Sequence, residues 1–209
     1  MATTRPNRSI ADFKSKLVGG GARPNLFEVQ LTTVPNFPSW NKSDFKFMCK
    51  ASSLPASNIA NIDVPFRGRI FKVAGDRTID TWSVTVINDE SFEYRNGFEE
   101  WMQLISRLEN NLGATNPEAY MTNATVIQLG KGTATGKKDP KGKTASGNNS
   151  AAYGGNDQRV AELARYQFQD IFPTNISAID LSYDNSDQIE EFTVEFQVNS
   201  YSRLFNKED

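Results

Sequence analysis

The sequence predicts a mainly β (α+β) protein, an antiparallel β-sandwich or barrel-like subunit with one flanking amphipathic helix. Three observations indicate this fold class. Apolar and polar residues alternate with a period of two in several segments before residue 90 and again after residue 160. One stretch between them, residues 92–113, has the helical period instead. Strands and helices therefore do not alternate along the chain, as a parallel βαβ sheet would require.

The first 22 residues are predicted to form an N-terminal arm, ahead of a single domain over 23–201 and a C-terminal tail over 202–209. The arm is polar, but Ile10, Phe13 and Leu17 fall on one face of a short helix. Two interpretations stay open. The arm either docks on a neighbouring molecule or is a frayed terminus.

Strands are expected in "NLFEVQLT", in "DFKFMCKAS", where Phe45, Phe47 and Cys49 share a face, and in "IANIDVPF". The proline-bearing "SSLPASN" between the last two is predicted to be a turn. The strand "RIFKV" is followed by "AGDRT", predicted as a tight turn in which Gly75 takes a positive φ. After it, "DTWSVTVI" places Trp82, Val84 and Val86 on one face, which we expect in the core.

The single long helix is predicted over residues 92–113, with Ser91 or Asp89 as N-cap and Gly113 at its end. Its apolar positions are expected to pack on a sheet: Phe92, Phe98, Trp101, Leu104, Ile105 and Leu108. The strands "RYQFQDIF", "NISAIDLSYD" and "EEFTVEFQVNSY" follow, and the turn "YDNSDQ" is expected to join the last two.

Residues 129–156 form a basic segment with seven glycines, five lysines and one acid, Asp139. Such a composition cannot bury a core, so a solvated loop is predicted. It does not fit a phosphate-binding loop, because Lys131 and Lys138 stand where glycine and Ser/Thr are needed. Nucleic-acid binding is less favoured than a solvated loop, since Tyr153 is its only aromatic residue. Contact with an acidic protein surface stays open.

Composition excludes several enzyme classes. The 209 residues include no histidine, so neither a Ser-His-Asp triad nor an imidazole zinc site can be built. The single cysteine, Cys49, is expected to be a buried, inert thiol. The acids around Asp180–Glu191 lack the glycine turn of a calcium loop and are interpreted as a polar hairpin. We expect no catalytic site, no cofactor, no metal and no membrane anchor.

Three segments together resemble the tail tube proteins of contractile-tailed (myovirus, T-even-like) bacteriophages. They are "ARPNLFEVQ" at 22–30, "FMCKASSLPASNIANIDVPFRGRIFKVAGDRTIDTWSVTVINDE" at 47–90, and "DIFPTNISAIDLSYDNSDQIEEFTVEF" at 170–196. The resemblance implies a virion protein, made in the host cytoplasm, whose hexameric rings stack into a hollow tube. Its implied partners are further copies of itself, the tail sheath, the baseplate tube initiator, the tail terminator, the tape-measure protein and non-specifically bound double-stranded DNA in the lumen.

The same resemblance leads to residue-level expectations for assembly. Contacts between subunits or rings are expected at Ser52, Leu54, Pro55, Asn58, Asp76 and Arg77. Asp63 and Asp180 are expected to face the lumen, where acids would repel DNA phosphates. The basic segment, as an insertion relative to the family, is expected to face outward toward the sheath through Lys131, Lys137, Lys138, Lys141 and Lys143. Two alternatives of the same architecture stay open, a baseplate tube initiator and a type VI secretion tube protein.

Overall fold

The computed structural model describes residues 10–17, 21–131, 162–184 and 187–204. The chain comprises two compact units. One is made of residues 1–27 and 127–165, and the other of residues 28–126 and 166–209. The second unit contains the hydrophobic core and a long β-hairpin.

In the first unit, helix α1 spans Ile10–Lys16, so the helix predicted in the arm is confirmed. Ile10 and Phe13 are exposed on it. Further along, the Leu129 amide donates to the Leu26 carbonyl at 2.8 Å, and the Gln128 side-chain amide donates to the same carbonyl at 2.7 Å.

Six strands form one sheet in the order β1-β6-β7-β8-β5-β2. Their bounds are Phe27–Leu31 (β1), Cys49–Ser52 (β2), Trp82–Ile87 (β5), Thr122–Leu129 (β6), Glu162–Ile176 (β7) and Glu191–Leu204 (β8). Strand β5 pairs antiparallel with both β2 and β8, with Val84 opposite Val194. The predicted mainly β fold class is confirmed.

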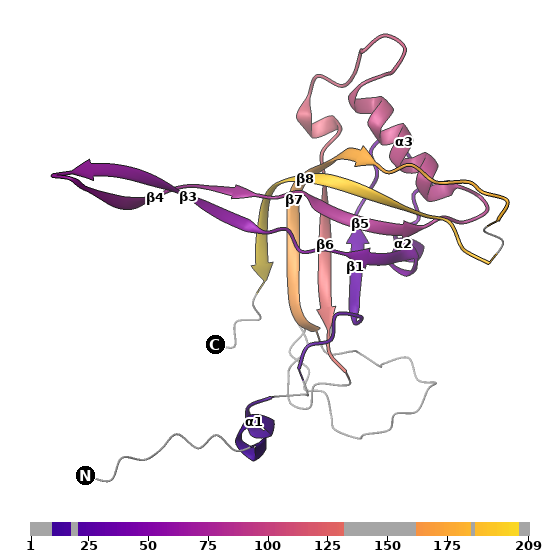
Figure 1. Cartoon of the computed structure of the whole chain (residues 1–209). Coiled ribbons are helices and arrows are strands. Elements are labelled where there is room, and N and C mark those ends of the chain that lie inside the picture. Colours follow the sequence, from indigo (N-terminus) through magenta and orange to yellow (C-terminus); the bar gives the residue numbers. More distant parts are fainter. Residues whose placement is uncertain (1–9, 18–20, 132–161, 185–186, 205–209) are drawn as a thin grey trace. The chain divides into compact units, whose positions relative to one another are not determined.

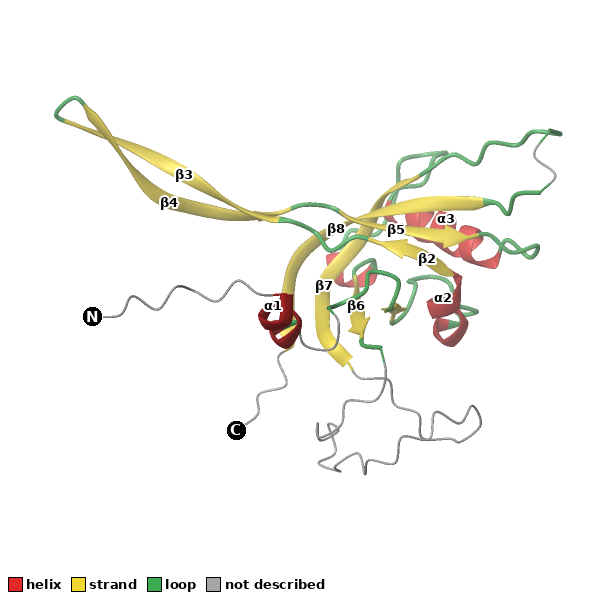
Figure 2. Cartoon of the chain, turned by 60° about the horizontal axis from the view of Figure 1, so that its bottom comes forward, coloured by secondary structure: helices red, strands yellow, loops and turns green. Residues whose placement is uncertain are grey.

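Strands β3 (Ser57–Phe66) and β4 (Arg69–Ile79) form a separate antiparallel hairpin. Figures 1 and 2 show it projecting away from strands β5 and β8 of the same unit. Its turn is Arg67–Gly68, where both residues have positive φ (45° and 81°). Glycine adopts that conformation without steric cost, which suits Gly68 to the turn.

Helices cover one face of the second unit's strands. Helix α2 (Lys42–Met48) begins at Asn41, whose side chain accepts from the amides of Ser43 and Asp44. Helix α3 spans Glu93–Ile105, and a 3-10 turn, η2, spans Pro117–Ala119. Trp40 packs between the two α-helices, with ring centroids 4.9 Å from Phe45 and 5.4 Å from Phe98.

The core is aromatic and follows the strand alternation. Trp82, Val84 and Val86 are all buried on β5, as predicted. Trp82 lies 4.9 Å from Phe168 and 5.1 Å from Phe196, ring centroid to ring centroid. Val29 and Leu31 on β1 are also buried, which confirms the alternation predicted for the first strand. Burying side chains of this size supplies much of the stability of a fold with no disulfide.

Two predicted elements are wrong before residue 80. The predicted strand at 44–52 is helical up to Met48, which buries Phe45 and Cys49 four residues apart and leaves Phe47 73% exposed. The predicted turn "AGDRT" instead lies inside β4. Among the described glycines, positive φ occurs at Gly21 and Gly68, so the expected positive φ at Gly75 is also wrong.

The long helix and the last strands also differ in their limits. Helix α3 ends at Ile105 instead of Gly113, and its N-cap is Phe92 in the left-handed conformation. Phe92 and Leu108 are exposed, while Phe98 and Trp101 are buried as predicted. Strand β7 ends at Ile176, so the strand predicted over 175–184 is mostly a loop. Strand β8 is confirmed and continues to Leu204.

Candidate assembly surface

The β3–β4 hairpin carries an apolar face that its own subunit leaves uncovered. Cross-strand partners lie on the same face of an antiparallel pair. Ile62 is paired with Val73, and Val64 with Phe71, while Phe66 ends the row opposite Arg69. We call the five apolar residues of this row the apolar face: Ile62 (54% exposed), Val64 (43%), Phe66 (66%), Phe71 (67%) and Val73 (42%). A contiguous exposed set of this kind marks a protein interaction site.

The opposite face of the hairpin is more polar. It carries Asn61 opposite Ala74, Asp63 opposite Lys72, and Pro65 opposite Ile70. The Lys72 ammonium donates to Asp63 Oδ1 at 2.7 Å, and the Asn61 side-chain amide donates to the same oxygen at 3.1 Å. Asp63, an expected lumen-facing acid, therefore has its charge balanced within the hairpin.

A β-bulge separates the base of the hairpin from its outer part. Ile59 pairs with Arg77, whereas Asn61 pairs with Ala74, so two residues of β4 (Gly75 and Asp76) stand opposite Ala60. An extra residue bends the strand and changes which side chains share a face. A Cβ at Gly75 would lie 3.0 Å from the Ala60 carbonyl oxygen, which explains why the smallest residue occupies this position.

Three of the six residues predicted for contacts between subunits make contacts inside this one. Ser52 Oγ accepts the Trp82 indole N–H at 2.9 Å, and Pro55 is buried. The Asn58 side-chain amide donates to Asp80 Oδ1 at 3.0 Å. The Ser52–Trp82 bond joins β2 to β5, and the Asn58–Asp80 bond lies at the base of the hairpin.

The other three predicted contact residues, Leu54, Asp76 and Arg77, are exposed. Within the described part of the chain, neither Asp76 nor Arg77 forms an ion pair with another residue. The six predicted contact residues therefore all lie near the hairpin base. Three of them contact their own subunit, and the other three are exposed to solvent.

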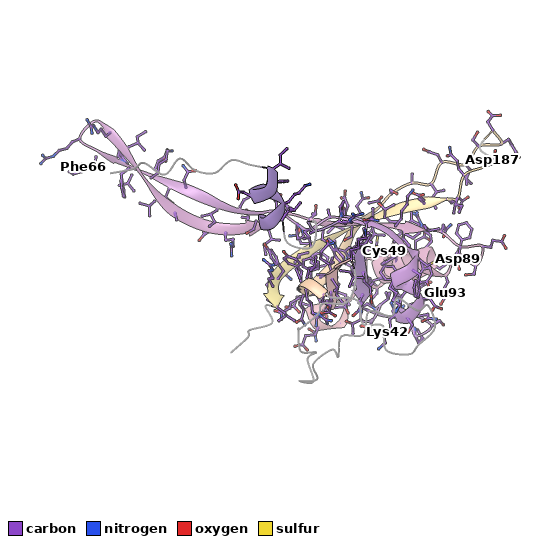
Figure 3. All side chains as sticks on the ribbon, turned by 90° about the horizontal axis from the view of Figure 1, so that it is seen from below. Lys42, Cys49, Phe66, Asp89, Glu93 and Asp187 are labelled. Atoms are coloured by element: carbon purple, nitrogen blue, oxygen red, sulfur yellow. The ribbon has the colours of Figure 1, made fainter. Side chains whose placement is uncertain are left out.

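A second exposed surface lies in the loop between β7 and β8, in its described residues 177–184 and 187–190, which include the predicted Asp180. Leu181 (79%), Tyr183 (fully exposed) and Ile189 (71%) have little cover from their own subunit. Figure 3 shows Phe66, at the hairpin tip, and Asp187, in this loop, at opposite extremities of the same unit. The structure thus places the two expected lumen acids, Asp63 and Asp180, on different elements.

The described residues offer few groups that could support catalysis or metal binding. Among them, no group of three His, Cys, Asp or Glu side chains lies close enough to hold a metal ion, and no helix is long and apolar enough to cross a membrane. Two hollows of about 430 and 400 Å³ lie beside α3 and share Glu100 and Gln103. Glu99, which lines the smaller hollow, accepts from Arg95 Nε at 2.6 Å.

Two titratable groups have strongly shifted pKa values. Burial raises the pKa of the Cys49 thiol to about 12, in agreement with the predicted inert thiol. Burial, assisted by nearby carboxylates of which Asp44 contributes most, raises the pKa of Tyr94 to about 12. Both groups belong to the packed interior. Of the predicted outward-facing lysines, Lys131 is described, and the other four lie outside the described residues.

The apolar face has a sequence pattern of its own, a period of two over residues 62–66. Ile62, Val64 and Phe66 recur at every second position, separated by Asp63 and Pro65, as apolar residues do in a strand with one buried face. Periodicity shows that one face meets an apolar environment, but it does not show whether this chain or another supplies that environment.

Comparisons with known proteins agree with a protein that assembles. Residues 22–204 match the model of the family described as phage tail tube protein. The tail tube protein gp19 of Enterobacteria phage T4 is 31% identical over 176 residues, which cover 84% of this chain and 88% of that protein.

Two solved structures share the fold. One is described as a sheath–tube complex of an extracellular contractile injection system (TM-score 0.52, 11% identity, 95% of this chain and 99% of that chain). The other is described as a 6-fold symmetrised anti-feeding prophage baseplate (TM-score 0.51, 11% identity, 88% of this chain and 95% of that chain). The chain therefore belongs to the phage tail tube protein family, as a structural subunit of the tail tube and a component of the virion tail.

Proposed function

We propose that six copies of this chain close into a ring and that the rings stack into a hollow tube inside a contractile sheath. The observation that carries this proposal is the apolar face of the β3–β4 hairpin, which is extended, exposed and without cover from its own subunit. A tube supplies that cover from neighbouring copies. The membership of the family and the 6-fold symmetry described for a structural relative support the ring.

The proposed ring is wide enough to pass DNA. If each of six copies contributes about four strands spaced ~4.8 Å apart, the inner sheet has a circumference on the order of 115 Å. Barrels of about 16–18 strands already contain an aqueous channel. The tube acts by geometry, without catalysis, as a conduit through which genomic DNA leaves the virion after the sheath contracts.

We infer that the more polar hairpin face, including Asp63, and Asp180 line the lumen. The support for Asp63 is its position opposite the apolar face, which needs cover from neighbouring copies. The pair with Lys72 leaves this part of the wall close to neutral. A neutral or acidic wall releases few counterions from DNA and so lets it slide.

Contacts between subunits are assigned in the proposal to Leu54, Asp76 and Arg77, because they are exposed at the hairpin base. Ser52, Pro55 and Asn58 support those contacts by orienting the hairpin. The basic segment with Lys131, Lys137, Lys138, Lys141 and Lys143 faces the sheath, and the tube ends meet the initiator and the terminator. The tape-measure protein occupies the lumen before DNA enters.

Electron microscopy of the purified full-length protein tests the proposal. Stacked tubes with sixfold end views are the expected result. Rings that never stack would indicate an initiator role, and a monodisperse monomer at all concentrations would contradict the proposal. Addition of the purified sheath protein then tests the outer surface, since it should decorate preformed tubes.

A further inference from the structure

We propose that rings stack head to tail, with the hairpin of one subunit docking on the β7–β8 loop of a subunit in the next ring. This inference rests on the proposed tube and specifies its axial contact. The hairpin is residues 57–79, the receiving surface is made of residues 177–184 and 187–190 of the loop, and both belong to the same compact unit.

The two surfaces lie at opposite extremities of that unit. Figure 3 shows the hairpin tip at Phe66 and the loop at Asp187 far apart on either side of the strands. Strand β3 has ten residues, so the hairpin reaches roughly 33 Å, enough to extend well beyond its own subunit. A molecule with two such ends contacts its copies in series.

The charges of the two surfaces are complementary. The hairpin contains four basic residues and two acidic ones, a net charge of +2. At its tip, Arg67 and Arg69 form no ion pair within the described part of the chain. The loop contains four acidic residues (Asp180, Asp184, Asp187 and Glu190) and no basic residue, a net charge of −4. Two hairpins, or two loops, facing each other would repel.

Both surfaces also present uncovered apolar side chains. The hairpin offers its apolar face, and the loop offers Leu181, Tyr183 and Ile189. An apolar contact surrounded by complementary charges is the usual anatomy of a specific interface. Because the two surfaces are different, the contact is heterologous, and repetition of a heterologous contact that does not close produces an open filament.

Charge reversal in the full-length protein tests the pairing. Variant A carries Arg67→Glu and Arg69→Glu, which bring the hairpin to a net charge of −2, and variant B carries Asp180→Lys, Asp184→Lys and Asp187→Lys, which bring the loop to +2. In variant A both surfaces are acidic, and in variant B both are basic, so each alone should lose tubes in electron micrographs. An equimolar mixture should form tubes again, because each hairpin then meets a loop of opposite charge.

The controls separate this inference from the proposed function. Glu100→Lys with Glu109→Lys and Glu118→Lys makes the same charge change as variant B at exposed sites outside both surfaces, and it should leave tubes intact. If wild-type tubes form and variants A and B form them equally well, or if their mixture fails to restore tubes, the inference is overturned. A wild-type protein that never polymerises would instead contradict the proposed function.

Disulfide trapping provides a second measurement that does not depend on charge. Arg69→Cys with Gln188→Cys places one thiol on each surface, while the native Cys49 is buried and therefore contributes no background. Oxidation of assembled tubes should produce a ladder of covalent multimers in the double variant and dimers at most in either single variant. A double variant that remains monomeric inside intact tubes would overturn the pairing.

Discussion

Replacement of Phe71 by alanine should weaken tube assembly while leaving the folded subunit unchanged. Phe71 is 67% exposed on the apolar face. A phenylalanine of ~200 Å² then offers roughly 130 Å² to a neighbouring copy, which at ~25 cal/mol per Å² is worth about 3 kcal/mol if fully covered. Alanine retains part of this contact, so the expected loss is about 2 kcal/mol per subunit, or about 30-fold in the association constant.

The assay is a pelleting experiment over a range of protein concentrations, which gives the critical concentration for tube formation. We expect this concentration to rise by about 30-fold in Phe71→Ala. The free energy of unfolding of unassembled subunits, measured with urea, should change by less than about 0.5 kcal/mol, because the side chain makes few contacts inside its own subunit.

Phe47→Ala is the matched control, since Phe47 is 73% exposed but lies on helix α2, away from the hairpin. It should leave the critical concentration unchanged. The reasoning is refuted if Phe71→Ala assembles like the wild type, if Phe47→Ala is equally impaired, or if Phe71→Ala destabilises the isolated subunit by the full 2 kcal/mol.

Three further changes test the base of the hairpin, the end of α3 and the buried titratable groups. Arg77→Ala should reduce tube yield in electron micrographs while the urea midpoint of the subunit stays constant, and an equal loss in both would make Arg77 a local structural residue. Gly113→Ala should destabilise the subunit by more than about 2 kcal/mol in urea unfolding, because a Cβ there would lie 1.9 Å from the Ile105 carbonyl oxygen; an unchanged midpoint would contradict the close approach. The pKa values of Cys49 and Tyr94 are raised to about 12 from their ordinary 9.0 and 10.0, so the folded state retains their protons longer than the unfolded state does. Stability should therefore be constant below pH 9 and fall as the pH rises toward 12, which thermal melts in that window measure; slow labelling of the native thiol by a disulfide reagent at pH 8 provides a second check.

The elements that were predicted correctly are those whose environment comes from their own chain. On β5, Trp82, Val84 and Val86 all meet the interior of the same subunit, so the period of two predicted both the strand and its buried face. The same holds for Phe98 and Trp101 on α3 at helical spacing. In these elements local pattern and tertiary packing agree, which is the condition under which sequence reasoning succeeds.

The errors occur where short elements leave the pattern ambiguous. Phe45, Phe47 and Cys49 recur every two residues, which is the spacing of a strand. Phe45 and Cys49 are also four residues apart, which is the spacing of one helix face, and the seven-residue helix α2 with its C-cap Cys49 buries these two. Asn41, whose side chain accepts from two amides at the start of that helix, was the available signal. Helix α3 ends early because the following segment folds back, and the Ala114 amide caps the Leu104 carbonyl at 2.9 Å.

The candidate assembly surface was predicted only in part, for a different physical reason. Asp76 and Arg77 were predicted to lie in a turn at a boundary between subunits, whereas the structure has them in strand β4. The uncovered apolar face was not predicted at all, because a strand that will be covered by a second copy has the same pattern as one covered by its own chain. The three-dimensional fold is needed to show that no part of the same subunit covers this face.

The bulge at Gly75–Asp76 has a consequence for how genes of this kind can change in length. Between the bulge and the hairpin tip, each side chain of β4 stays on its face of the hairpin only if the number of residues in that stretch does not change. Loss or gain of a single codon in this stretch would rotate the outer part of β4 by half a turn, exchanging the side that Phe71 and Val73 occupy with that of Lys72. Length variation within the hairpin should therefore be tolerated mainly in steps of two residues on each strand, with Gly75 kept at the junction.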